Sequence, residues 1–255
     1  MEYFVDENSI VRKIWSKSET ILFIFAGSAA EFALNKAVDW LYFTGKLPAD
    51  PIGRLFSTVT YARQIVFFEN EKALAAIDKI RSIHGEVEKN RKANIPAWAY
   101  RDVLFMLIHY SISSFELLER KLTADEKQEV YAVFYRLGTR MELTNLPSDY
   151  AAWLPVREEH LLADLEKSKY SIDLFKQYKK HLGIFRYYIL KESQKLVAPK
   201  RVSELLHFGK FSILTAILPF YKLAGKLKVS WIIKKIILPR KYILQIKNLD
   251  VVPSR

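Results

Sequence analysis

Apolar residues recur at helical spacing along almost the whole chain, and this pattern constrains the fold more than any single motif. No window shows the sustained alternation of apolar and polar residues that a half-buried strand requires. Only 8 of the 255 residues are glycine and 9 are proline, which favours helices over a turn-rich β fold. Since half of the residues are apolar, the chain can bury a substantial core. The sequence therefore predicts an all-α fold, a single large bundle-like domain.

Capping residues and interruptions of the pattern indicate where these helices begin and end. Thr123 and Glu126 have the spacing of a capping box, and Asn70 is expected to cap the helix that follows it. Gly138 is expected to lie just past the end of a helix, and Gly183 to interrupt another. We expect helices over roughly 5–34, 52–68, 71–91, 96–120, 123–138, 156–168, 171–195 and 200–208, with a loop or short helical turn over 146–155.

Positive charge is concentrated at the C-terminal end of the sequence. Residues 200–247 contain eleven Lys and Arg against one acid, Glu204, and account for +10 of the net charge of +12. Trp, Tyr, Ile and Leu are interleaved with these cations. We therefore expect two parts: a helical body over 1–200 and a basic amphipathic helical tail over 201–255. The tail can close the core or lie on a membrane surface through residues 210–247. Its dense Ile and Leu argue against nucleic acid as a partner.

Several kinds of site are excluded by what the sequence lacks. It has no Cys, so disulfides, thiolate metal sites and Cys nucleophiles are ruled out. No phosphate-binding glycine loop, G-x-S-x-G elbow, HExxH motif or carboxylate–histidine cluster is apparent, so a zinc site is not expected.

No signal peptide or transmembrane segment is recognised, which predicts a cytoplasmic protein with or without peripheral membrane contact. Pairing with Arg or Lys is expected for most of four acids in apolar surroundings: Asp39, Asp102, Glu116 and Glu142.

The chain has five histidines, and the pattern places two of them inside. His84 continues the apolar stripe of its helix, and His109 lies on a helix that is apolar almost all round. A buried histidine requires either a hydrogen-bond partner or a metal. His160 is expected to be solvated because acids surround it, and His181 and His207 carry no signal for a ligand role.

Arg54, Thr58 and His84 together suggest a cofactor site. They place a guanidinium, a hydroxyl and an imidazole on two adjacent predicted helices. A haem site needs an axial ligand, a polar group on the open face and a cation for the propionates. The alternative is that these are three ordinary residues of a helical protein.

Several ordered segments resemble a known family. They are AGSAAEFALNKAVDWL, LPADPIGRLFSTVTYARQIVFF, KIRSIHGEVEKNRKANIPAWAYRDVLFMLIHYSI, LTADEKQEVYAVFYRLGTRMELTNLP and YKKHLGIFRY, and they cover roughly residues 20–200. The family comprises fungal membrane-associated oxygenases of the MpaB type and bacterial rubber oxygenases (latex clearing protein). The resemblance implies an all-α domain around a pocket for one haem b, and O2-dependent oxidation of a hydrophobic, often isoprenoid, substrate.

The resemblance also assigns roles to particular residues. It implies that His84 is the proximal ligand of the haem iron, and that Arg54 and Thr58 line the distal or propionate side. His109 is the second candidate for the ligand. In the rubber-cleaving branch a lysine directly precedes the threonine, whereas this chain has Ser57 there, so its distal chemistry departs from that branch.

The function expected from the sequence is a haem-b-dependent oxygenase acting on a lipid or isoprenoid-like substrate. Two alternatives stay open. One is a non-enzymatic helical protein that binds lipid or a membrane surface, and the other is a haem carrier or sensor without turnover.

Overall fold

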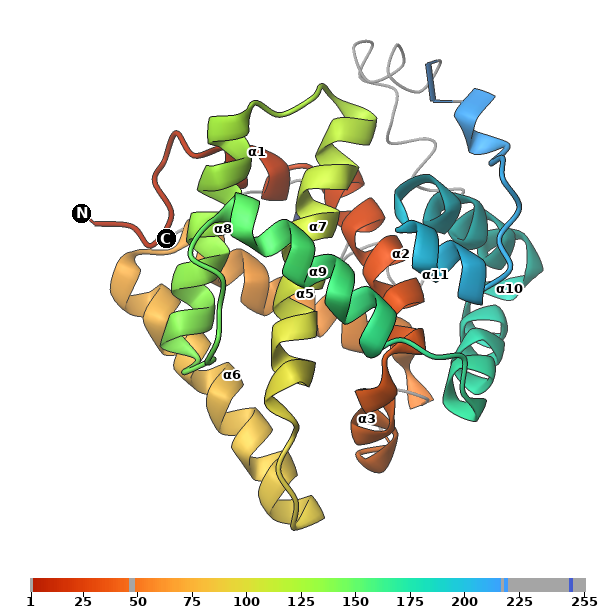
Figure 1. Cartoon of the computed structure of the whole chain (residues 1–255), viewed down its shortest axis with the longest axis horizontal. Helices are drawn as coiled ribbons and strands as arrows, with labels where there is room; N and C mark the ends of the chain where they lie inside the picture. Colours follow the sequence, from red (N-terminus) through yellow and green to blue (C-terminus); the bar gives the residue numbers. More distant parts are fainter. Residues whose placement is uncertain (1, 46–48, 217, 220–247, 250–255) are drawn as a thin grey trace.

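The computed structural model describes residues 2–45, 49–216, 218–219 and 248–249, and the described chain is all-α (Figure 1). Within these ranges no strand forms, and the β pairing consists of two isolated bridges, Tyr3–Glu69 and Asn35–Leu165. The predicted fold class is confirmed. The helices are α1 (Ile10–Trp15), α2 (Ser18–Leu34), η1 (Lys36–Val38), α3 (Asp39–Phe43), α5 (Pro51–Phe67), α6 (Asn70–Arg91), α7 (Ala97–Leu118), α8 (Ala124–Arg140), α9 (Tyr150–Ala163), α10 (Lys169–Val197) and α11 (Lys200–Leu205).

Two of the predicted helix boundaries agree with local chemistry in the structure. The capping box at the start of α8 is present, with Thr123 and Glu126 each satisfying the other's backbone N–H. Gly183 interrupts α10 with φ of 75°, a left-handed backbone that costs glycine little. Each of these signals involves only residues next to the boundary, so each can be recognised from the sequence alone.

Other predictions about helix boundaries were wrong. These boundaries depend on packing between helices or on a capping residue that the sequence pattern did not indicate. Asn70 is the first residue of α6, and its predicted side-chain cap is absent. α8 continues past Gly138, where an added Cβ would lie 2.7 Å from Leu104, so this glycine serves close packing. α9 begins at Tyr150 rather than near 156, because the Asp149 carboxylate accepts a hydrogen bond of 2.8 Å from the Ala152 N–H.

α2 lies at the centre of the core and packs against α7 and α10 (Figure 1). The small residues of α2 permit this close approach. A Cβ added to Gly27 would lie 2.2 Å from the Tyr110 ring on α7 and 2.9 Å from Val197 at the end of α10. The glycine is therefore required by contact with two helices.

A buried ion pair joins the same interface to α9. Arg157 of α9 donates to the Glu31 carboxylate of α2 at 2.6 Å, and their side chains are 4% and 1% exposed. The Tyr110 hydroxyl donates to the same Glu31 oxygen at 2.9 Å. The buried carboxylate thus has two partners from two other helices, which offsets the cost of removing it from water.

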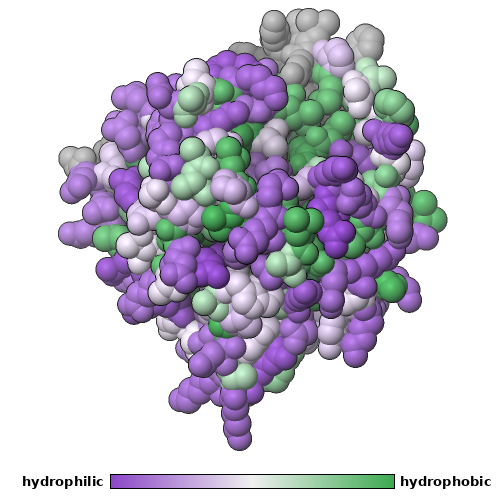
Figure 2. All heavy atoms as spheres, in the orientation of Figure 1, coloured by the Kyte–Doolittle hydropathy of each residue, from purple (hydrophilic) through white to green (hydrophobic). Residues whose placement is uncertain are grey.

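Hydrophilic side chains predominate on the face shown in Figure 2, and the larger hydrophobic patch lies toward the side where α10 and α11 are found. Around the Gly183 kink, Ile184 is 76% exposed and Phe185 is 60% exposed. None of the described helices combines the length and the apolarity that crossing a bilayer would require.

Parts of the predicted tail pack on the body. Val202 of α11 is fully buried among Ala30, Leu34, Leu161 and Leu165. The Arg63 guanidinium of α5 donates to the Asn248 carbonyl at 2.9 Å. The stretch 220–247, which holds most of the predicted membrane-contacting segment, lies outside the described residues.

Replacing Gly27 with Ala is predicted to destabilise the protein by about 1–3 kcal/mol, because the added methyl overlaps the Tyr110 ring in a packed core. Gly85→Ala is the matched control, since a Cβ at this helical position of α6 meets nothing within 4 Å. It is predicted to stabilise the protein by about 0.5–1 kcal/mol. Urea unfolding of both variants measures the difference, and equal stabilities would contradict the packing role of Gly27.

Candidate cofactor site

The first turn of α5 positions the predicted Arg54 and Thr58. The Asp50 carboxylate accepts a hydrogen bond of 3.1 Å from the Gly53 N–H and fixes where the helix starts. Arg54 is half-buried and donates to the Ser57 hydroxyl at 3.3 Å. The Thr58 hydroxyl is on the exposed side and donates to the Arg54 carbonyl at 3.1 Å, so only its lone pairs are free to accept. Among the described residues, the ion pairs between arginine and a carboxylate involve other arginines and not Arg54: Arg81, Arg91, Arg120, Arg140 and Arg157.

His84 lies on α6 and faces the start of α7. Its side chain is half-buried, and its Nδ1 atom is buried without a hydrogen-bond partner in the described part of the chain. The Tyr100 ring lies 5.2 Å from the imidazole, centroid to centroid, at 56°. Glu88, one helical turn after His84, holds Tyr100 in place by accepting from its hydroxyl at 3.2 Å.

The pKa of His84 depends on burial and on two charged neighbours. Burial lowers the pKa of His84, the positive charge of Arg54 lowers it further, and the Glu88 carboxylate opposes both. Arg54 of α5 thus acts electrostatically on His84 of α6, and these two helices pack against each other. A lowered pKa keeps the imidazole neutral near pH 7, which is the form that binds metal.

His109 lies apart from this group. Burial and the nearby Arg157 charge lower its pKa to about 4, and its Nε2 atom is buried without a partner among the described residues. His109 is nine residues after Tyr100 on α7, which corresponds to about 13 Å along the helix axis. The two candidate histidines thus belong to different places in the fold.

His109 lines a pocket between α7 and α9. The pocket has a volume of about 420 Å³. Its wall combines apolar side chains such as Ile112, Trp153 and Leu154 with four charged residues, Glu116, Lys127, Arg157 and Glu158. His84 and Arg54 do not line it. A second hollow, of about 350 Å³, lies beside α8 and contains none of the predicted site residues.

The structure corrects the expectation for His160. Its side chain is only 11% exposed, and Nδ1 lies 2.5 Å from Asp102 Oδ1 and 3.0 Å from Asp164 Oδ2. A carboxylate–histidine cluster is therefore present, contrary to the sequence-based expectation. His160 and Asp164 are four residues apart on one helix face, and that spacing was the available signal. Asp102 comes from α7, and only the fold reveals it.

The other three acids in apolar surroundings pair with cations, as predicted. Asp39 pairs with Arg91 at 2.6 Å, Glu116 pairs with Lys121 and Lys127, and Glu142 pairs with Arg81. Arg91 also lies 4.0 Å over the Trp40 ring, which ties the end of α6 to α3. These contacts fix the part of α6 that carries His84.

The residues around His84 fit a haem group. A neutral imidazole with an unsatisfied buried nitrogen offers an axial ligand, and a nearby guanidinium without a carboxylate partner offers a counter-ion for propionates. His109 offers an unsatisfied ring nitrogen as well. Among the five histidines, all within the described residues, these two have such a nitrogen.

The lowered pKa of His109 predicts a specific dependence of stability on pH. Between about pH 6.5 and pH 4 the unfolded chain binds a proton at this histidine and the folded chain does not, so stability falls as the pH falls. Glutamine does not bind this proton. Between the same two pH values the His109→Gln variant should therefore lose up to about 3 kcal/mol less stability than the wild type. Urea unfolding at a series of pH values measures it. The exposed His207→Gln is the control, and a His109→Gln slope equal to that of the wild type would refute the prediction.

Comparison with known proteins found one relationship. No curated protein and no solved structure matched the chain. A family model described as the catalytic domain of ER-bound oxygenase mpaB/B′ and rubber oxygenase matches residues 15–223, which include α2 to α11 and every candidate residue above. With most of its length matched, the chain belongs to the MpaB and rubber oxygenase catalytic-domain family.

Proposed function

We propose that this chain is a haem-b-dependent oxygenase that acts on a hydrophobic, lipid or isoprenoid-like substrate. Family membership gives the oxygenase class, and the environment of His84 supports the choice of cofactor. The observation that carries the proposal is a neutral imidazole with an unsatisfied buried nitrogen, close to a guanidinium that has no carboxylate partner among the described residues.

In this proposal the residues around His84 have different roles in holding the cofactor. His84 would bind the haem iron, and the Tyr100 ring limits the directions that the imidazole can take. Arg54 supplies positive charge for a propionate or for negative charge that develops during oxidation. Thr58 supplies an acceptor at the open edge of α5. Haem, when bound, supplies the O2 chemistry that no amino-acid side chain provides.

The proposed substrate is apolar because α7 and α9 offer apolar surface. The pocket between these helices has aromatic and aliphatic side chains such as Ile112, Trp153 and Leu154 in its wall, beside His109 and the charged groups that complete the lining. A hydrocarbon chain gains about 25 cal/mol for each Å² that it buries there. The His109 imidazole stays neutral, so it adds no charge to this wall.

Peripheral membrane contact is proposed for residues 210–247. Eleven Lys and Arg over 200–247 favour anionic lipid headgroups, and Phe211 at the start of this segment is 87% exposed. Deleting residues 210–255 should abolish salt-sensitive pelleting with liposomes that contain phosphatidylserine. Pelleting that is unaffected by the deletion would reject this part of the proposal.

Replacing His84 with Ala is predicted to abolish stoichiometric haem binding, because the axial ligand is lost while the half-buried position tolerates the smaller side chain. Titration of the full chain with haemin, followed by absorbance, measures the stoichiometry. His207→Ala is the exposed control and should bind as the wild type does. Retained binding in His84→Ala together with loss in His109→Ala would move the ligand to His109.

Oxygen consumption separates the oxygenase from the two alternatives. The haem-loaded chain is mixed with an emulsified polyunsaturated isoprenoid hydrocarbon in an oxygen electrode. Consumption that requires both haem and hydrocarbon supports the oxygenase. Haem binding without consumption favours a carrier or sensor, and failure to bind haem favours the lipid-binding protein.

A further inference from the structure

A second cluster of potential ligands lies between α7 and α9, away from His84. Asp102, His160 and Asp164 each offer one ligand atom, and these atoms all lie within 4.8 Å of one another. The side chains are 3%, 11% and 18% exposed, so the cluster is largely shielded from water and Asp164 is its most exposed member. The proposed oxygenase function uses none of these residues.

The fold orients the Asp102 carboxylate through Asn35. The Asn35 amide donates to Asp102 Oδ2 at 2.6 Å, which leaves Oδ1 directed at His160. Asn35 is itself fixed, because its Oδ1 accepts from the Ala37 N–H at 2.9 Å. A hydrogen bond that orients a ligating carboxylate in this way is a regular feature of metal sites.

Two carboxylates face one imidazole at the cluster. These three side chains together carry a net charge of −2 when His160 is neutral and −1 when it is protonated. Lys36 and Arg101 lie near enough to offset part of this charge, but they donate their hydrogen bonds to the Ala163 carbonyl at 2.6 Å and the Thr144 carbonyl at 3.2 Å. Arg157 pairs with Glu31.

We propose that Asp102, His160 and Asp164 bind a divalent first-row metal ion, such as Zn²⁺, Mn²⁺ or Fe²⁺, through one imidazole nitrogen and two carboxylate oxygens. Such an ion with a neutral imidazole brings the charge of the cluster to zero. Imidazole and carboxylate together are ligands that these three ions accept. Because the ligands come from α7 and α9, the ion crosslinks these helices beside the buried Glu31–Arg157 pair. The site is independent of the proposed haem.

Zn²⁺ is the probe of choice because it binds such sites more tightly than Mn²⁺ or Fe²⁺. The full chain, stripped with a chelator and left without haem, is titrated with Zn²⁺ by calorimetry. We expect one Zn²⁺ per chain and a melting temperature that rises with bound zinc. His160→Ala and Asp164→Asn should each weaken binding by at least about tenfold and remove the rise. Asp164→Asn is the milder change, since this side chain is partly exposed.

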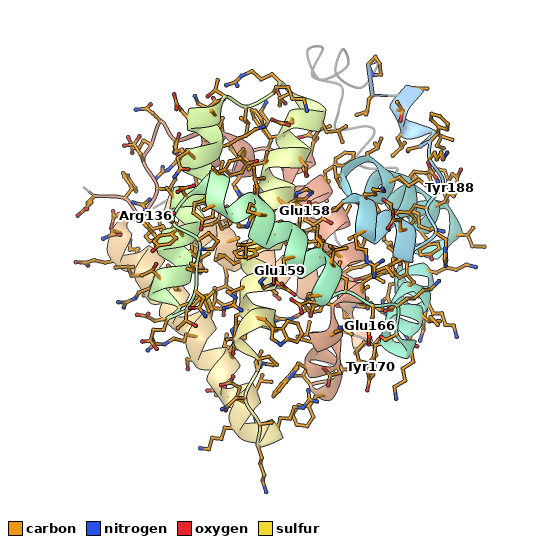
Figure 3. The ribbon with its side chains drawn as sticks, viewed as in Figure 1. Arg136, Glu158, Glu159, Glu166, Tyr170 and Tyr188 are labelled. Carbon is orange, nitrogen blue, oxygen red and sulfur yellow. The ribbon has the colours of Figure 1, made fainter. Side chains whose placement is uncertain are left out.

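Glu159→Gln is the matched control, because this exposed acid lies on α9 next to His160 and outside the cluster (Figure 3). It should bind Zn²⁺ as the wild type does. Absence of a saturable site in a folded wild-type chain would overturn the proposal, as would equal zinc affinity in the wild type and both cluster variants. An NMR titration that shows His160 charged at pH 7 in the presence of Zn²⁺ would also overturn it, and would identify the cluster as an imidazolium bridged by two carboxylates.

Discussion

The ion pair between Glu31 and Arg157 fixes the relative positions of α2, α7 and α9. Both charges are almost completely removed from water, where an unpaired carboxylate or guanidinium would be strongly destabilising. Tyr110 completes the group by donating to Glu31, and its ring occupies the space that Gly27 leaves open. Once α7 is held in this register, one end of the helix presents Tyr100 to α6. Asp102, near the same end, contacts His160 of α9, and His109, near the middle, lines the pocket between α7 and α9.

The proposed haem site lies at the edge of this core rather than inside it. α5 and α6 form a helical pair that carries Arg54 and His84. Arg91 joins the end of α6 to α3, and Asp78 joins its middle to Arg140 of α8. Arg54 and His84 are half-buried, whereas the Glu31 and Arg157 side chains are almost completely buried. A guanidinium without a carboxylate partner among the described residues and an unsatisfied imidazole nitrogen suit a site that receives an anionic, metal-containing ligand.

Much of the fold follows from the sequence because helical periodicity and caps are local. The capping box of α8, the break at Gly183 and the inward direction of His109 could all be read along the chain. Gly138 and Asp149 show where prediction from local patterns fails. Gly138 is explained by its contact with Leu104 of another helix, and Asp149 is an N-cap that the sequence pattern did not indicate. The same holds for the candidate sites. Arg54 and His84 could be proposed from sequence patterns and from the family resemblance. The contact between Asp102 and His160 joins residues 58 positions apart, and no local pattern specifies it.

The most direct test is the visible absorption spectrum of the full chain, purified from cells supplied with a haem precursor and recorded oxidised and then reduced. The proposal predicts a Soret band corresponding to one haem per chain, which shifts on reduction. A chain that is folded but shows no Soret band, even after reconstitution with haemin, would contradict it. The family relationship would then describe the fold without the haem chemistry.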